Sequence, residues 1–90
     1  MDKKEPNFSD VKARLEAPEF LTYHLVLEVP QMLYHEVLKH YSGDIYALEP
    51  AQEFVSQYLR YRGDNGIVGL VGVEKKSDTV LIDAAVRYVH

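Results

Sequence analysis

Residues 20–29 alternate between two sets of side chains, and this alternation constrains the fold more than any other feature of the chain. A period of two residues is typical of a β-strand, whose successive side chains point to opposite faces. The second set mixes apolar and polar side chains. The first set contains only apolar and aromatic residues, namely Leu21, Tyr23, Leu25, Leu27 and Val29. We therefore expect a strand over 20–29 that buries one face completely.

Two amphipathic helical patterns follow this strand. Residues 31–41 place Leu33, Tyr34, Val37, Leu38 and Tyr41 in one sector of a helix, and residues 50–61 do the same with Ala51, Phe54, Val55, Tyr58 and Leu59. Pro30 and Pro50 each suit the first turn of the helix that follows it, and Gly63 suits the end of the second helix. The sequence therefore predicts a helix over 31–41 and a second from 50 to about 61.

The remaining segments predict a hairpin and a short N-terminal helix. Residues 67–75 and 79–89 are rich in β-branched side chains and flank a turn signal, so they predict an antiparallel hairpin. At the N-terminus, Val11 and Leu15 are four residues apart and Pro18 follows, which favours a helix over 10–17. Residues 1–8 are polar and predict a flexible leader, which leaves 9–90 as a single domain.

The predicted element order is thus α-β-α-α-β-β. This order indicates the α+β class: a small three-stranded, mostly antiparallel sheet with helices packed on one face. A chain of 90 residues forms a single domain, and it buries only about 60–65% of the surface of its unfolded state. A homo-oligomer or a larger protein partner that buries more surface is therefore expected.

Composition excludes several classes of protein. The chain has no cysteine, so neither disulfides nor cysteine-ligated metals are expected. Its longest apolar runs are too short to span a membrane, and no signal peptide is visible, so we expect a cytoplasmic location and no membrane association. The net charge is −4. Residues 20–50 carry −3 of this charge, because they contain one base, Lys39, and four acids: Glu28, Glu36, Asp44 and Glu49. No basic stripe exists, which argues against nucleic-acid binding.

The motifs that could carry chemistry are weak. His35 and His40 are five residues apart, whereas two helical metal ligands need a spacing of four, so no metal and no cofactor is expected. Asp83 is the lone acid in an apolar strand and alternates with Thr79 and Arg87, which predicts a carboxylate that faces solvent. No Ser-His-Asp or paired-carboxylate arrangement follows from the spacing. The sequence therefore gives no sign of an enzyme.

Binding of single-stranded nucleic acid is a third-ranked possibility. Arg60 and Arg62 lie among tyrosines, and rings with arginines can stack bases. The order β-α-α-β-β resembles that of the KH RNA-binding domain. That module needs a Gly-x-x-Gly loop, whereas the matching junction reads Ser42-Gly43-Asp44-Ile45, so the family is not assigned.

The leading hypothesis is a small non-enzymatic interaction module, an adaptor or inhibitor that self-associates. A last strand at the edge of a three-stranded sheet would template pairing with another chain. The predicted interface is therefore drawn from that strand: Val80, Ile82, Asp83, Val86, Arg87 and Tyr88. The alternative is a small-molecule-binding protein or enzyme. Its pocket between sheet and helices would be lined by Tyr23, Tyr34, Tyr41 and Tyr58.

Overall fold

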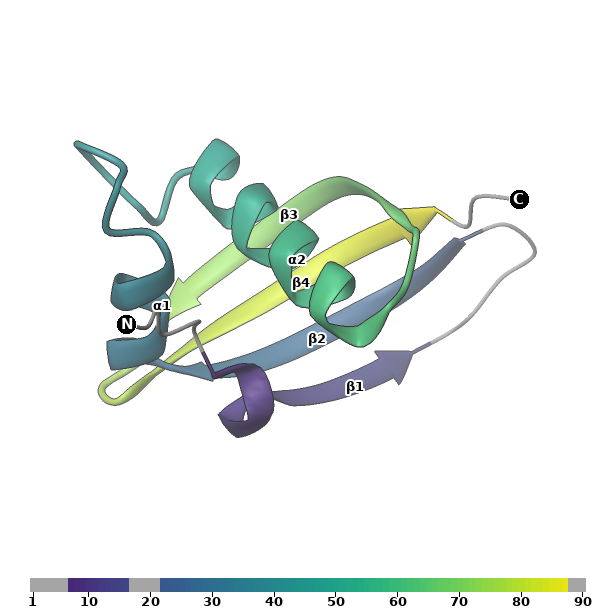
Figure 1. Ribbon diagram of the computed structural model, residues 1–90, viewed down its shortest axis with the longest axis horizontal. Coiled ribbons are helices and arrows are strands. Elements are labelled where there is room, and N and C mark those ends of the chain that lie inside the picture. Colours follow the sequence, from purple (N-terminus) through teal and green to yellow (C-terminus); the bar gives the residue numbers. More distant parts are fainter. Residues whose placement is uncertain (1–6, 17–21, 88–90) are drawn as a thin grey trace, which may run out of the picture.

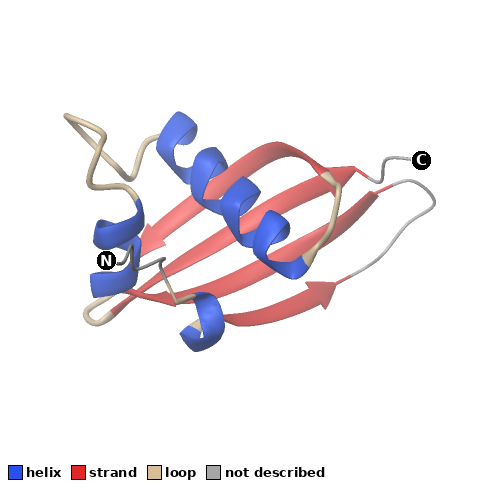
Figure 2. Cartoon of the chain, viewed as in Figure 1, coloured by secondary structure: helices blue, strands red, loops and turns tan. Residues whose placement is uncertain are grey.

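The computed structural model describes residues 7–16 and 22–87, which form one sheet and two α-helices (Figure 1). In chain order the elements are a 3-10 turn η1 (Phe8–Asp10), β1 (Lys12–Glu16), β2 (Thr22–Pro30), α1 (Gln31–Val37), α2 (Leu48–Arg62), β3 (Ile67–Lys75) and β4 (Thr79–Arg87). The four strands pair antiparallel in the order β1-β2-β4-β3. Both helices lie on one face of this sheet, as expected (Figure 2).

The predicted N-terminal helix over 10–17 is wrong, because most of this segment is strand β1. The predicted three-stranded sheet is therefore wrong as well, and the observed order is β-β-α-α-β-β after η1 rather than α-β-α-α-β-β. Ala13 and Leu15 alternate with charged residues, so the segment also has a period of two. The segment is thus compatible with both a helix and a strand. Its backbone pairing with β2, in which Arg14 lies opposite Val26, stabilises the strand.

The longer predicted elements are confirmed with shifted boundaries. Strand β2 and the β3–β4 hairpin lie where the sequence pattern predicts them. The pairing of β3 with β4 shifts its register between Val68 and Val71. Helix α2 ends at Gly63, which has a φ of 80° and donates its N–H to the carbonyls of Arg60 and Leu59. Helix α1 stops at Val37, four residues earlier than predicted, and a turn follows in which Tyr41 N–H donates to Leu38.

The hydrophobic core fills the layer between the sheet and the helices. It combines the inward side chains of β2 and β4 with the apolar stripe of α2, chiefly Leu25, Leu27, Val29, Val80, Ile82, Ala84, Val86, Phe54, Val55, Tyr58 and Leu59. Phe8 belongs to this core although the sequence places it in the leader: it is buried, and its ring centroid lies 5.6 Å from that of Phe54. Residues 1–6 of that leader lie outside the described residues.

Tyr34 is a fully buried hydroxyl-bearing residue of α1. Its Oη donates a hydrogen bond to the carbonyl oxygen of Ile45 at 2.7 Å, and its ring stacks on that of Tyr46 at 5.4 Å. Burial raises the pKa of the Tyr34 hydroxyl well above its usual value, and the nearby Tyr46 and Asp44 raise it further. In the folded protein this group therefore keeps its proton at a pH where the unfolded chain loses it.

This difference predicts a loss of stability at alkaline pH. Above about pH 10 the unfolded state binds fewer protons than the folded state, so the free energy of unfolding falls as pH rises. Tyr34→Phe should cost about 1 kcal/mol at neutral pH, because it removes one hydrogen bond. It should also flatten the alkaline decline. Urea unfolding of both proteins from pH 8 to pH 11 measures this, and parallel declines would contradict the assignment to Tyr34.

Candidate functional site

The helix-covered side of the sheet is left partly open beside β1. Helix α2 packs over β3 and β4 and does not cross β1 (Figure 1). Beneath the C-terminal end of α2 lies a cavity of about 520 Å³ that opens toward β1. We call it the β1–α2 groove. Its lining comprises Ala13 and Leu15 of β1, Tyr23 and Leu25 of β2, Tyr58, Leu59 and Arg62 of α2, and the turn residues Asp64, Asn65 and Gly66.

Leu15 is a large apolar residue of this groove that remains exposed. Its side chain is on the helix-covered face of the sheet, since it pairs with the buried Leu25, yet it remains 60% exposed. Tyr61, on the last turns of α2, is 54% exposed and lies with its ring centroid 5.3 Å from that of Phe8. Large apolar side chains left uncovered next to a concave surface are typical of a binding site.

One cation borders the groove. Arg62 donates from Nη1 to the Tyr58 hydroxyl at 3.1 Å, and its guanidinium carbon lies 5.8 Å from the centre of the Tyr58 ring. The hydrogen bond to Tyr58 raises the pKa of Arg62, so the group stays charged at every accessible pH. The groove therefore offers an apolar floor and a positively charged group held in place by a tyrosine.

The four predicted pocket tyrosines do not share one site. Tyr23 and Tyr58 both line the β1–α2 groove. Tyr34, a residue of α1, is fully buried in the core. Tyr41 follows α1 and is half-buried, and its ring centroid lies 4.5 Å from that of His40. The structure thus brings two of the four together and adds Arg62, one of the two arginines that the sequence offers for base stacking.

The predicted interface residues separate onto two faces of β4. Val80, Ile82 and Val86 point into the core and are fully buried. Asp83 and Arg87 lie on the opposite face and are exposed, which confirms the prediction that Asp83 faces solvent. Tyr88 lies outside the described residues. The stated reason for this interface does not hold, because β4 is a central strand between β2 and β3 and the edge strands are β1 and β3.

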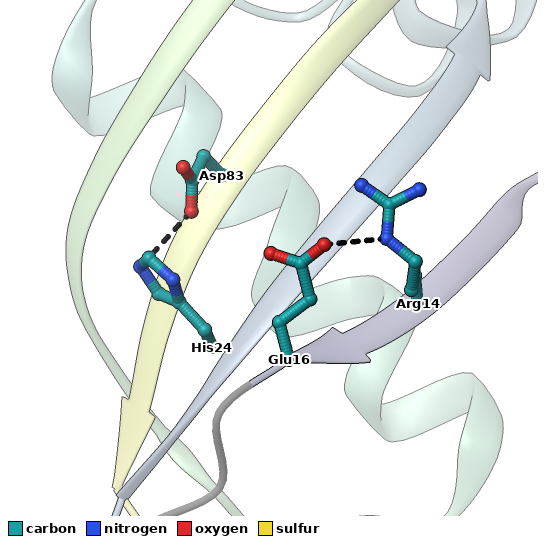
Figure 3. Close-up of polar contacts among 4 residues, drawn as sticks. All are labelled: Arg14, Glu16, His24 and Asp83. Atoms are coloured by element: carbon teal, nitrogen blue, oxygen red, sulfur yellow. Dashed lines mark hydrogen bonds and ion pairs between the residues drawn. The ribbon is translucent and has the colours of Figure 1, made fainter.

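The sheet face opposite the helices, here called the open face, carries mostly polar side chains. His24 Nε2 lies 3.0 Å from Asp83 Oδ1, and Arg14 Nε lies 2.6 Å from Glu16 Oε2 (Figure 3). Stacking of bases on a sheet needs exposed rings. In the described strands the only Phe, Tyr or Trp is Tyr23, and it faces the helices. Within the described strands the open face therefore carries no Phe, Tyr or Trp for base stacking, and its aromatic ring is His24, which is paired with Asp83.

Within the described residues, no three His, Asp or Glu side chains are close enough together to hold a metal ion. No helix in this part of the chain is both long and apolar enough to cross a membrane. His35, one of the two histidines considered as metal ligands, instead lies with Nε2 2.9 Å from the Tyr46 hydroxyl.

Comparison with family models, with curated proteins and with solved structures gave no match to this chain. Sequence reasoning missed Leu15 as a site residue because it assigned residues 10–17 to a helix. The signal that reveals it is the alternation of Lys12, Arg14 and Glu16 with Ala13 and Leu15, which places the two apolar residues on one face of a strand.

Proposed function

We propose that this chain is a non-enzymatic protein-interaction module that binds its partner at the β1–α2 groove. The observation that carries the proposal is the exposure of Leu15 on the sheet face that the helices cover over β2 and β4. A groove between a helix and an edge strand suits an extended segment of another chain. Such a segment can pair its backbone with the strand and place alternate side chains in the groove.

The electrostatics of the groove fit a partner of mixed polarity. Among its lining residues one cation, Arg62, is balanced by one acid, Asp64. The groove lining is therefore neutral although the whole chain carries −4. The four acids of residues 20–50 do not line the groove, so they do not repel a partner there at close range.

A second candidate function is supported by the tyrosines of the same groove. Its volume of about 520 Å³ lies within the range of about 300–1,000 Å³ usual for small-molecule sites. Tyr23, Tyr58 and Arg62 together would suit an apolar or aromatic acid, whose carboxylate would meet the guanidinium. A small ligand of this class should raise the melting temperature of the protein in a thermal-shift screen of small molecules. If the groove binds a protein segment instead, no compound of the screen should raise it.

Affinity capture from the native host tests the proposed function. The wild-type chain and two variants, Leu15→Lys and Met32→Lys, serve as baits. Met32 is the matched control, because it is an apolar residue 85% exposed on α1 and away from the groove. We expect the chains retained by the wild type and by Met32→Lys to be the same, and to be lost from Leu15→Lys. Retention of the same chains by Leu15→Lys would remove the groove from consideration.

A further inference from the structure

We infer that the segment that occupies the β1–α2 groove is β1 of a second copy of this chain. The two β1 strands would pair antiparallel about a two-fold axis at Arg14. This inference rests on the proposed function and names the partner. Three features support it: the regularity of the two sheet edges, the order of charges along β1 and the size of the side chains beside the groove.

Of the two edge strands, β1 is the better template. It pairs with β2 in one continuous register from Lys12 opposite Glu28 to Glu16 opposite His24. The other edge, β3, has a register shift between Val68 and Val71. Such an irregularity bends a strand and interrupts its row of backbone donors and acceptors, which blunts pairing with another chain. Of the two edge strands in the described part of the sheet, β1 is therefore the one whose register is regular over its whole length.

The charges of β1 are complementary to themselves when the strand is turned around. In the antiparallel register centred on Arg14, Lys12 lies opposite Glu16 of the partner subunit, and Glu16 lies opposite the partner's Lys12. Opposite charges placed directly across a strand pair are stabilising. Arg14 faces the partner's Arg14, and each guanidinium already holds a Glu16 carboxylate at 2.6 Å (Figure 3), which reduces their repulsion.

The same register also matches the apolar side chains beneath the sheet. Leu15 comes to lie opposite the partner's Ala13, so a large side chain meets a small one on both sides of the axis. Both residues line the β1–α2 groove. The pairing therefore covers the exposed part of Leu15 and joins the two grooves into one apolar layer. A two-fold arrangement of this kind closes on itself and stops at the dimer.

The size of this interface sets the expected affinity. Each β1 strand offers five residues, which is a small contact compared with the 1,200–2,000 Å² of a stable interface. We therefore expect a dissociation constant of roughly 1–100 μM.

Sedimentation velocity over about a hundredfold range of concentration around this value tests the dimer. The wild type should pass from monomer to dimer. Leu15→Lys should raise the dissociation constant at least tenfold while its circular dichroism spectrum stays that of the wild type. Met32→Lys should associate like the wild type. A wild type that is monomeric throughout, or a Leu15→Lys variant that still dimerises equally well, overturns the inference.

Disulfide trapping tests the register. Because the chain has no cysteine, a single introduced thiol can react only with the same thiol of another copy. Arg14→Cys places two thiols at the axis, with Cβ atoms about 4.5–5.5 Å apart, close to the separation that a disulfide spans. Lys12→Cys places them roughly 13 Å apart. Under mild oxidation the first variant should form a covalent dimer and the second should not. Equal trapping of both, or faster trapping of Leu15→Cys, overturns this register.

These outcomes separate the inference from the proposed function. The wild type could stay monomeric and still capture other chains in a way that depends on Leu15. This result contradicts the homodimer but agrees with the proposed interaction module. A monomer whose captured chains are also insensitive to Leu15 contradicts both.

Discussion

Val86→Lys is expected to abolish folding. Val86 is fully buried on the central strand β4, within the core beneath α2. An ammonium group forced into this site has no partner, and the cost of burying it reaches about 5 kcal/mol or more, comparable to the whole stability of a small domain. The variant should lose its cooperative thermal transition and its native circular dichroism spectrum, both measured directly against the wild type.

Asp83→Lys is the matched control for this variant. It introduces the same side chain three residues earlier on β4, but on the open face, where the Asp83 side chain is 55% exposed. The substitution removes the contact with His24, an exposed pair worth less than about 1 kcal/mol. The variant should therefore keep its fold. Equal loss of structure in both variants would show that the two faces of β4 have been assigned incorrectly.

Phe54→Ala is expected to cause the second-largest loss of stability. The Phe54 ring is fully buried and lies 5.6 Å from the ring of Phe8 and 5.2 Å from that of Tyr34, so it joins η1, α1 and α2. Its truncation removes apolar contacts and leaves a cavity, at a cost of about 3–5 kcal/mol. The urea midpoint should fall sharply, with a slope close to that of the wild type.

Tyr61→Ala provides the control on the same helix. Tyr61 is also an aromatic residue of α2 that touches Phe8, but it is mostly exposed. Its truncation should cost less than about 1 kcal/mol, because little buried surface is lost. If Tyr61→Ala lowers the free energy of unfolding as much as Phe54→Ala, then the exposed contact of Tyr61 with Phe8 stabilises the protein as much as the buried contact of Phe54 does, which contradicts this expectation.

The sequence predicts the long periodic elements well and the short one badly. Strand β2, helix α2 and the β3–β4 hairpin each repeat their period several times, so local pattern and tertiary packing agree. The segment around β1 has only Val11 and Leu15 as large apolar residues, and their spacing is compatible with a helix. Its strand state depends on backbone pairing with β2, a nonlocal interaction that no local pattern contains.

The same limit explains the prediction of the site. Tyr23 and Tyr58 come from segments predicted correctly, and the structure brings them to one groove. Leu15 was missed because its segment was assigned to the wrong element. The edge of the sheet was assigned to the last strand because nothing local shows that β4 inserts between β2 and β3. Strand order is a property of the whole chain, and it decides which surfaces are free.

The position of β4 also determines the order in which the molecule can assemble. It lies between β2 and β3 in the sheet although it follows both in the chain. Leu27 of β2 can pair early with Ala13 of β1, but its pairing with Ile82 on the other side must wait for β4. Closing so long a loop is slow, because its entropy is lost before the contacts form. Until residues 79–87 pair with β2 and β3, the central position of the sheet is empty and the edges of both strands are unpaired there. Unpaired strand edges of this kind favour aggregation in partly folded chains.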